Sequence, residues 1–341
     1  MDELSSVSII IPCRNEKKFI ATCLDSIIAN DYTKDKFEVL VVDGMSEDGI
    51  RDIIRQYTKQ YPFIRLLDNP KKITPCALNI GIKNAKSEII MRMDAHNTYE
   101  KEYVSKCIKY LKEYNADNVG GVIRTVSRDG TFIGKAIALV LSHRFGVGNS
   151  VFRTGSKEPK WVDTVFGGCY KKEVFERIGL FNENLARGQD MEFNLRLKKA
   201  GLKTLLVPEI VSYYYARSGF KSFCRHNFVN GAGLIYPPLK FGIVIFSWRH
   251  LAPLTFVSSL IGSALLSFFS PIFLWLFLVI VSSYSSINIY FTIKSAIGKK
   301  NFKYLFIMPI IFATLHISYG FGSLWGVIKL LLPAKMNYRC Q

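Results

Sequence analysis

The sequence predicts an α/β domain with a mostly parallel sheet flanked by helices, followed by transmembrane helices. Two observations carry this prediction. Short β-branched runs alternate with amphipathic stretches through the first 240 residues, a pattern typical of parallel strands covered by helices on both faces. From Arg249 onward the chain consists mainly of long apolar stretches. We therefore expect two domains, at 1–240 and 241–341.

The N-terminal part repeats one strand–helix unit. Apolar runs predict strands at 7–11, 37–43, 64–67 and 88–94, and amphipathic stretches predict helices at 16–30, 47–61 and within 75–86. In such sheets ligands collect at the carboxyl ends of the strands. Polar residues stand there: Arg14 and Glu16 after the first strand, Asp43 after the second, and Asp94 and His96 after the fourth.

Three apolar stretches predict about three transmembrane helices, at 251–269, 271–293 and 304–328. The first two carry no charge and have about the ~20 residues that a helix requires to cross a bilayer. Buried helices of a soluble protein are the alternative.

Basic residues indicate which side of the membrane each loop occupies. The loop after the second stretch contains Lys294, Lys299, Lys300 and Lys303, so we expect it, with the N-terminal domain, in the cytoplasm. Three crossings would place the chain end outside, although Lys329, Lys335 and Arg339 make it basic too. Two to four crossings therefore stay open.

Composition narrows the function. The net charge is +18, but no nucleic-acid motif is present, so anionic lipids and phosphorylated substrates explain the charge better. Seven cysteines without close pairs predict free thiols rather than a disulfide framework or zinc site. The acidic start, MDELSSVSIII, runs directly into a strand and predicts no signal peptide. The sequence does not fix the oligomeric state, and an oligomer is possible.

No glycine-rich phosphate loop is present. GTFIGKA at 130–136 has one residue too few between its glycines, and Ala136 stands where a P-loop needs Ser or Thr. A diphosphate ligand would therefore need a divalent cation or basic side chains to balance its charge.

Each candidate residue also has a structural interpretation. Asp94-Ala95-His96, in MRMDAH, is either a metal site or a polar turn. Asp43 before Gly44 fits an Asx turn, and Asp190 fits a helix N-cap. Gly167 and Gly168 fit a tight turn or a close approach of backbone to a ligand.

Four motifs stand in order along the chain and favour the functional interpretation: VSIIIPCRNEKKFIATCLDSI, FEVLVVDGMSEDGI, MRMDAH and GQDMEFNLRLKKAGLKTLLVPE. Together they resemble a family 2 glycosyltransferase with the GT-A fold. The chain is particularly similar to the membrane-attached bacterial enzymes of succinoglycan-type exopolysaccharide synthesis. The resemblance covers about residues 5–250, and RHLAPL and HISYGFGSLWG extend it into the membrane part.

The resemblance implies a nucleotide-sugar donor site. Asp43 would accept hydrogen bonds from the nucleotide base, and Pro12, Arg14 and Glu16 would line the same pocket. A UDP-sugar is the favoured donor. Asp94 and His96 match the Asp-x-Asp motif that holds Mn²⁺ or Mg²⁺ on the diphosphate, so Asp94 also counts among the donor-binding residues. Histidine in place of the second acid favours Mn²⁺.

The resemblance makes Asp190 the catalytic base, with Gln189 replacing the glutamate that usually precedes it. Further expected roles follow. Glu192, Arg196, Gly167 and Gly168 are candidates for orienting the base or the acceptor, and Arg217, Arg225 and His226 are candidates for the donor diphosphate or a lipid phosphate.

The function implied is an inverting, metal-dependent transfer of one sugar to a lipid-linked glycan in surface polysaccharide synthesis. The enzyme would be a multi-pass protein of the cell membrane with a cytoplasmic catalytic domain. A processive polysaccharide synthase is an alternative, weakened by the absence of Gln-x-x-Arg-Trp. A non-catalytic nucleotide-sugar-binding scaffold is the other.

Overall fold

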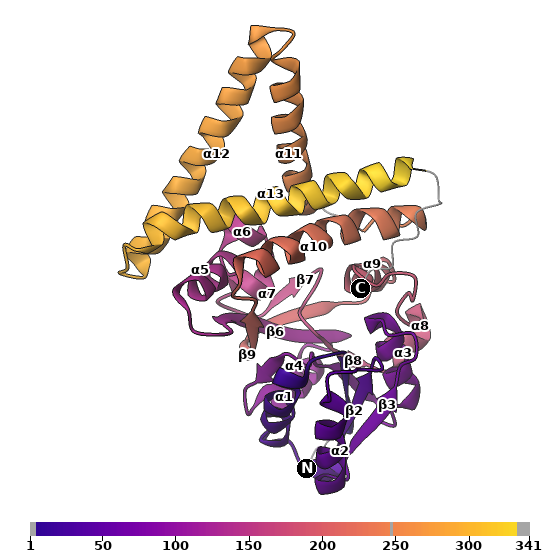
Figure 1. Cartoon of the computed structure of the whole chain (residues 1–341). Helices are drawn as coiled ribbons and strands as arrows, with labels where there is room; N and C mark the ends of the chain where they lie inside the picture. The colour runs from indigo at the N-terminus through magenta and orange to yellow at the C-terminus, as the bar shows by residue number, and fades with distance from the viewer. Residues whose placement is uncertain (1–4, 246–247, 333–341) are drawn as a thin grey trace. The chain divides into compact units, whose positions relative to one another are not determined.

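The computed structural model describes residues 5–245 and 248–332. By internal packing the chain forms two units (Figure 1). The first comprises residues up to 125 and 150–215, and the second comprises 126–149 and the chain from 216 onward. The domain boundary predicted at 240 marks the end of the strand–helix alternation and stays a prediction; packing groups 126–149 and 216–240 with the apolar helices. Lys335, Arg339 and Cys340 lie outside the described residues.

Four parallel strands lie at one side of the sheet in the first unit. They are β1 (Val7–Cys13), β2 (Phe37–Asp43), β3 (Ile64–Asp68) and β4 (Ile89–Arg92). β1 pairs with both β2 and β4, and β2 pairs with β3. These strands match the predicted ranges closely. β1 and β2 are apolar runs buried on both faces, as is typical of parallel strands, whereas β3 is only partly buried.

The rest of the sheet is largely antiparallel. Its strands are β5 (Asn97–Tyr99), β6 (Asn118–Ser127), β7 (Lys160–Val162), β8 (Cys169–Lys171) and β9 (Thr204–Ala216). β8 runs antiparallel to β4 and β6, and β9 runs antiparallel to β5 and β7. The strand order is β3-β2-β1-β4-β8-β6-β9-β5, with β7 beside β9. The α/β class is confirmed, and the sheet is mixed.

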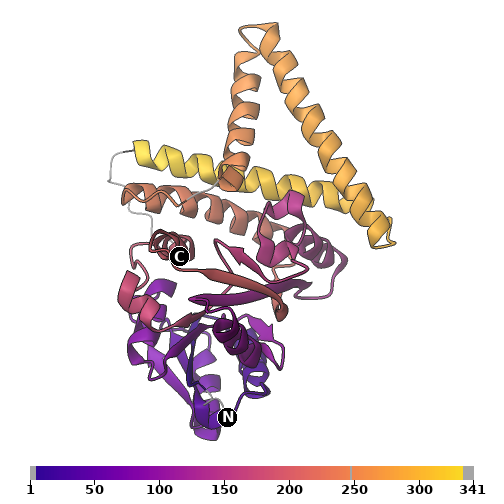
Figure 2. The ribbon, with the colours of Figure 1, turned by 180° about the vertical axis from the view of Figure 1, so that it is seen from behind.

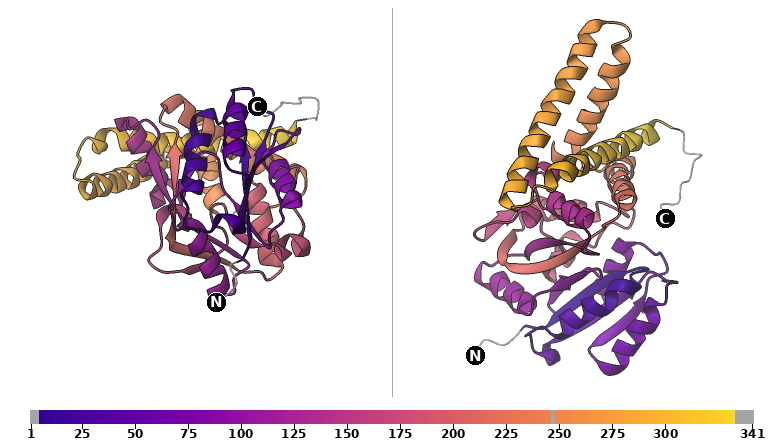
Figure 3. Two further views of the ribbon diagram at one scale, coloured as in Figure 1. Left: turned by 90° about the horizontal axis from the view of Figure 1, so that it is seen from below. Right: turned by 60° about the vertical axis from the view of Figure 1, so that its left-hand side comes forward.

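Helices cover both faces of this sheet (Figure 3). The first-unit helices are α1 (Lys17–Ile28), 3-10 helix η1 (Lys34–Lys36), α2 (Ile50–Gln60), α3 (Thr74–Asn84), α4 (Tyr103–Glu113), α7 (Val151–Thr154), α8 (Glu173–Ile178) and α9 (Gln189–Lys199). In β1, Ile9 and Ile11 join a core built with α1, α2 and α4. Ile10 points the other way, into a core with α3, α8 and α9. This alternation fixes the register of β1 in the sheet, and the register in turn fixes the positions of the polar residues that follow the strand.

The second unit is helical. Its helices are α5 (Phe132–Leu141), α6 (Arg144–Val147), α10 (Phe220–Lys240), α11 (Trp248–Leu266), α12 (Pro271–Gly298) and α13 (Tyr304–Leu331). By length and composition, α12 and α13 are candidate membrane spans among the described residues, and the apolar part of α11 is shorter.

Candidate active site

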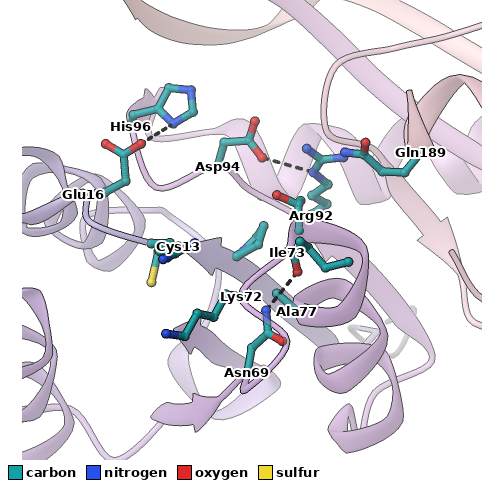
Figure 4. Close-up of a pocket in the computed structure, with 13 residues that line it drawn as sticks. Cys13, Glu16, Asn69, Lys72, Ile73, Ala77, Arg92, Asp94, His96 and Gln189 are labelled. Carbon is teal, nitrogen blue, oxygen red and sulfur yellow. Dashed lines mark hydrogen bonds and ion pairs between the residues drawn. The ribbon is translucent and has the colours of Figure 1, made fainter. Parts of the chain in front are cut away.

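A cavity of about 240 Å³ opens in the first unit where the parallel strands end. Loops after β1, β3 and β4 and the start of α9 supply its walls (Figure 4). Its lining residues are Pro12, Cys13, Arg14, Glu16, Asn69, Lys72, Ile73, Thr74, Ala77, Arg92, Asp94, His96 and Gln189. Five predicted donor-site or metal residues, namely Pro12, Arg14, Glu16, Asp94 and His96, lie together in this lining.

Arg92 links the predicted metal carboxylate to the predicted base. Its Nε donates to Oδ1 of Asp94 at 3.1 Å, and its Nη1 forms an ion pair with Oδ1 of Asp190. The Arg92 and Asp94 side chains are only 11% and 13% exposed, so solvent screens their contact little, whereas the Asp190 side chain is 44% exposed. Together the two carboxylates raise the pKa of Arg92 against the opposing effect of burial.

Gly167 and Gly168 hold the backbone of Arg92. The Arg92 amide donates to the carbonyl oxygen of Gly168 at 2.9 Å. Both glycines have positive φ, +68° and +114°. A Cβ on Gly167 would lie 2.7 Å from the Arg92 carbonyl oxygen, and one on Gly168 would lie 2.5 Å from the Tyr170 ring. In this structure the pair therefore permits close packing behind Arg92.

Asp190 lies in the first turn of α9, directly after Gln189. Removal from water raises the pKa of Asp190; the Arg92 guanidinium opposes that rise, and the Asp94 carboxylate adds to it. Gln189 is buried, and its Oε1 has no hydrogen-bond partner in the described part of the chain. Because Gln189 lines the cavity, this oxygen is available to a bound ligand.

Asp94 and His96 stand on the turn after β4. The Asp94 amide donates to the Tyr99 hydroxyl at 2.6 Å, which fixes the turn. Nδ1 of His96 lies 3.6 Å from Oε1 of Glu16, and the imidazole meets the Tyr214 ring edge-on at a centroid distance of 5.6 Å. Figure 4 shows Asp94 between the His96–Glu16 pair and Arg92.

These residues suit a divalent cation that is completed by its substrate. Among the described residues, no group of three or more His, Cys, Asp or Glu side chains is arranged to enclose a metal. A cation bound by a carboxylate and an imidazole would take its other ligands from water and phosphate oxygens, which is how Mg²⁺ is commonly held in phosphate-transfer sites. The donor set fits such an open site.

Asp43 occupies a different position from the other predicted donor residues. Its side chain is fully buried and lies outside the cavity lining. Its Oδ2 accepts from Arg51 Nη1 at 2.7 Å and from the Ser46 amide at 3.0 Å. Arg51 also binds Asp68 at 2.7 Å, so one guanidinium joins the ends of β2 and β3. The role of Asp43 in binding the base stays a prediction.

The loops after β1 and β2 are cross-linked by side chains. The Asn15 amide donates to Ser46 Oγ at 2.8 Å, and the Glu47 amide donates to Asn15 Oδ1 at 3.0 Å. The Lys17 amide donates to Asp48 Oδ2 at 2.9 Å. Asn15 adopts φ +55°, a conformation that asparagine tolerates better than most residues. These bonds hold Arg14 and Glu16 at the rim.

The remaining predicted residues lie elsewhere. Glu192 and Arg196 pair with each other at 2.7 and 2.8 Å, and Arg196 donates to the Leu180 carbonyl at 2.8 Å, so both support the loop before α9. Their role toward the acceptor stays a prediction. Arg217, Arg225 and His226 belong to the second unit, and their contact with phosphate also stays a prediction.

Sequence reasoning missed several lining residues. Asn69 and Lys72 follow the end of β3, and the polar stretch NPKK at 69–72 was their signal in the sequence. Lys72 has φ +62°, a strained conformation of the kind that concentrates at functional sites. Arg92 was visible as a lone charge inside the apolar run IIMRM.

Arg153 is a further basic residue that the sequence did not mark. Its guanidinium carbon lies 5.2 Å from the centre of the Tyr214 ring, and the same Tyr214 ring also contacts His96. Burial lowers the pKa of Arg153, and its Nη1 has no hydrogen-bond partner among the described residues. No carboxylate of the described chain lies within 4.0 Å of it. Arg153 is thus a cation without a carboxylate partner among the described residues, and the Tyr214 ring connects it to His96 in the cavity lining.

The mixed sheet, its parallel part ending at this cavity, is the architecture of the GT-A glycosyltransferases. Mannosyltransferase PcManGT from Pyrobaculum calidifontis, in complex with GDP-Man and Mn²⁺, shares the fold with a TM-score of 0.58 at 19% identity, covering 95% of this chain and 88% of that one. TarS 1-349 from S. aureus in complex with UDP-GlcNAc gives a TM-score of 0.51 at 19% identity, covering 67% and 66%.

Sequence comparison identifies the family. The model described as glycosyl transferase family 2 matches residues 8–179, and the chain belongs to that family. A Methanococcus voltae dolichyl N-acetyl-α-D-glucosaminyl phosphate 3-β-D-2,3-diacetamido-2,3-dideoxy-β-D-glucuronosyltransferase is 31% identical over 96% of this chain and 98% of its own length. The succinoglycan biosynthesis protein ExoA of Rhizobium meliloti is 31% identical over 74% and 83%. The protein is a glycosyltransferase.

Proposed function

We propose that this protein transfers one sugar from a nucleotide-sugar, with UDP-sugars favoured, to a hydroxyl of a lipid-linked glycan, with inversion at the anomeric carbon. The observation that carries the proposal is the double contact of Arg92. One buried guanidinium brings the carboxylate suited to a donor-bound cation and the carboxylate suited to a general base into a single site.

Asp190 is the proposed base. In an inverting displacement it would accept the proton of the acceptor hydroxyl as the new bond forms, a contribution of about 10²–10⁴ in rate. The Arg92 contact aims its carboxylate and keeps one of its oxygens occupied, so the other is free for the acceptor. The α9 N-terminus adds the positive end of a helix dipole.

Asp94 and His96 are the residues that would hold Mn²⁺ or Mg²⁺. Asp94 offers Oδ2, since Oδ1 is bound to Arg92, and His96 offers Nε2, since Nδ1 faces Glu16. When bound, the cation would stabilise charge on the departing nucleoside diphosphate. Arg14, Lys72 and Arg153 would supply further positive charge to that diphosphate.

The proposed acceptor is carried by a membrane lipid. The apolar helices of the second unit would attach the chain to a membrane, and the Methanococcus voltae relative is named for a dolichyl N-acetyl-α-D-glucosaminyl phosphate substrate. A multi-pass attachment with the catalytic domain in the cytoplasm would place a soluble donor and a lipid-borne acceptor at the same surface.

The test is nucleoside-diphosphate release by the full chain in detergent. A panel of UDP-, GDP- and dTDP-sugars is offered with lipid-diphosphate-linked sugars, with Mn²⁺ or with EDTA. We expect release from one donor that requires the acceptor and the metal, that adds one sugar, and that falls at least 100-fold in Asp94→Ala and Asp190→Asn. Long products would instead indicate a processive synthase. Binding of the nucleotide without turnover of any pair would favour the scaffold.

A further inference from the structure

α13 has the length and apolar character of a membrane span, but the protein packs against it closely. Of its most apolar window, 39% is buried, compared with 6% for α12. Phe132 of α5 stacks on Tyr304 at the start of α13 with ring centroids 5.1 Å apart. Further along, Phe145 of α6 contacts Phe312 at 5.0 Å. One side of α13 is therefore occupied by protein from its first turn.

α10 continues this packing to the other end of α13. A Cβ on Gly322 would lie 2.0 Å from the Phe228 carbonyl oxygen, so the two backbones touch. The Lys329 ammonium lies 5.6 Å from the centre of the Tyr236 ring. From the first contact to the second, the residue number increases in both helices, from Phe228 to Tyr236 in α10 and from Gly322 to Lys329 in α13. The two helices therefore run parallel and side by side (Figures 1 and 2).

α10 is too polar to enter hydrocarbon. Lys221, Arg225 and Lys240 are exposed on it. Moving a charged side chain to the bilayer centre costs at least about 2.5–3.5 kcal/mol each. Since α13 is packed against α10 through backbone contacts, crossing the bilayer would require α13 either to carry these charges inside or to give up the packing.

α11 and α12 have the opposite character. They form a hairpin. Large apolar side chains at and near its tip are exposed: Phe268 is 86% exposed, Phe269 is 87% exposed and Trp275 is 68% exposed. The first buried residue of α12 is Asn288, whose Nδ2 donates to the Pro309 carbonyl of α13 at 3.0 Å. The part of α12 before it is about 17 residues, or ~25 Å, close to the ~30 Å of a hydrocarbon core.

We propose that α11 and α12 alone cross the membrane, as one hairpin, and that α13 lies beside α10 at the cytoplasmic surface. This arrangement gives two crossings and returns the chain end to the side on which it entered. It differs from the sequence prediction that 304–328 crosses, and it does not depend on the proposed transferase reaction.

The distribution of charge supports two crossings. No Asp, Glu, Lys or Arg occurs from His250 to Ile293, so the hairpin and its turn at 267–270 are uncharged. Lys294 lies near the end of α12, and Lys299, Lys300 and Lys303 follow that helix. Lys329, Lys335 and Arg339 stand toward the chain end. Two crossings put both basic groups in the cytoplasm, as the positive-inside tendency requires, whereas three would leave one of them outside.

Reporter fusions to the whole chain in a bacterial host test the proposal. Green fluorescent protein placed after Gln341 should fluoresce as strongly as the same reporter placed before Met1, and alkaline phosphatase placed after Gln341 should stay at background activity. A dark fluorescent reporter with an active phosphatase at the C-terminus would overturn the proposal in favour of three crossings.

Cysteine labelling tests the hairpin itself. In Ser267→Cys, a membrane-impermeant maleimide should label intact cells, while the matched variant Lys299→Cys should be labelled only after the cells are broken. The unmodified chain provides the background for both. If Ser267→Cys stays unlabelled in intact cells, whether or not it is labelled after the cells are broken, the hairpin does not reach the far side and the proposed crossing is wrong. Labelling of Lys299→Cys in intact cells would also overturn it.

Discussion

Arg92 and Asp190 are 98 residues apart in the sequence, yet their side chains form an ion pair at the cavity. The same guanidinium binds Asp94. A salt bridge of this kind orients two carboxylates that would otherwise repel each other. We therefore expect Arg92 to act as a positioning residue for the reaction, although no substrate atom need touch it.

Replacing Arg92 should lower the free energy of unfolding and the activity, and the two losses should respond differently to a lysine at this position. Arg92→Gln leaves two carboxylates without their shared partner, and breaking such a buried pair typically costs about 3–5 kcal/mol. We expect a loss near the lower end of this range of free energy, because the Asp190 side chain is 44% exposed. Thermal unfolding in detergent should show the loss at neutral pH. Arg92→Lys should recover part of the stability but little activity, because an ammonium does not reproduce two fixed donors. Equal recovery of both would contradict a positioning role.

Activity should fall in acid with an apparent pKa above that of an ordinary aspartate, about 3.9. The base works only when ionised, and burial raises the pKa of Asp190 while Arg92 opposes the rise. In Arg92→Gln the opposing charge is gone, so the acidic limb of kcat/KM should move to higher pH. A pH profile of both proteins measures this. A limb that stays in place would show that another group controls it.

The metal preference should depend on His96. Imidazole suits Mn²⁺, whereas Mg²⁺ prefers oxygen ligands. His96→Asp should therefore keep metal-dependent activity and raise the ratio of Mg²⁺-supported to Mn²⁺-supported rate. Titration of nucleotide-dependent metal binding by calorimetry gives a second measurement that does not rely on turnover. An unchanged ratio and unchanged affinities would remove His96 from the metal site.

Arg153 should bind phosphate. Hydrogen bonds to charged groups contribute about 1.5–3 kcal/mol, so Arg153→Gln should weaken UDP binding about 10- to 100-fold if the donor diphosphate is its ligand. Binding of uridine, which has no phosphate, should not change and is the control. An increase in the acceptor KM with UDP binding intact would assign the residue to the lipid phosphate instead. No change in either would leave Arg153 with a purely structural role.

Gly167 should tolerate no side chain. Gly167→Ala combines the cost of a positive φ with a Cβ only 2.7 Å from the Arg92 carbonyl. Gly130→Ala is the matched control, since its φ of +71° is nearly the same but nothing lies within 4 Å of its Cβ. We expect a clearly larger fall in melting temperature and activity for Gly167→Ala. Equal effects would mean that backbone conformation alone explains the glycine.

Strand positions and the first candidate residues were predictable because they depend on local pattern. β1 to β4 stand out in the sequence as short apolar runs, and topology places the ends of parallel strands together, which is why Glu16, Asp94 and His96 meet. Three of the antiparallel strands were not predictable in the same way. β5, β7 and β8 have three residues each, too few for any periodicity to show.

The contacts that connect the site were beyond sequence reasoning. The pairing of Arg92 with Asp190 depends on how β4 and α9 pack, and no local signal reports a partner 98 residues away. The same limit applies to α13. Its composition matches a membrane span, and only its packing against α10 distinguishes it from α12.

The cross-links of Asn15, Ser46 and Asp48 between the first two loops have a thermodynamic consequence. The conformational entropy of this rim is lost when the chain folds, so little remains to be lost when a nucleotide arrives. A site ordered in advance binds with a small entropic penalty and without waiting for a loop to close. The donor should accordingly bind fast and with little change in the conformation of the protein. Any slow conformational change should then accompany the binding of the acceptor.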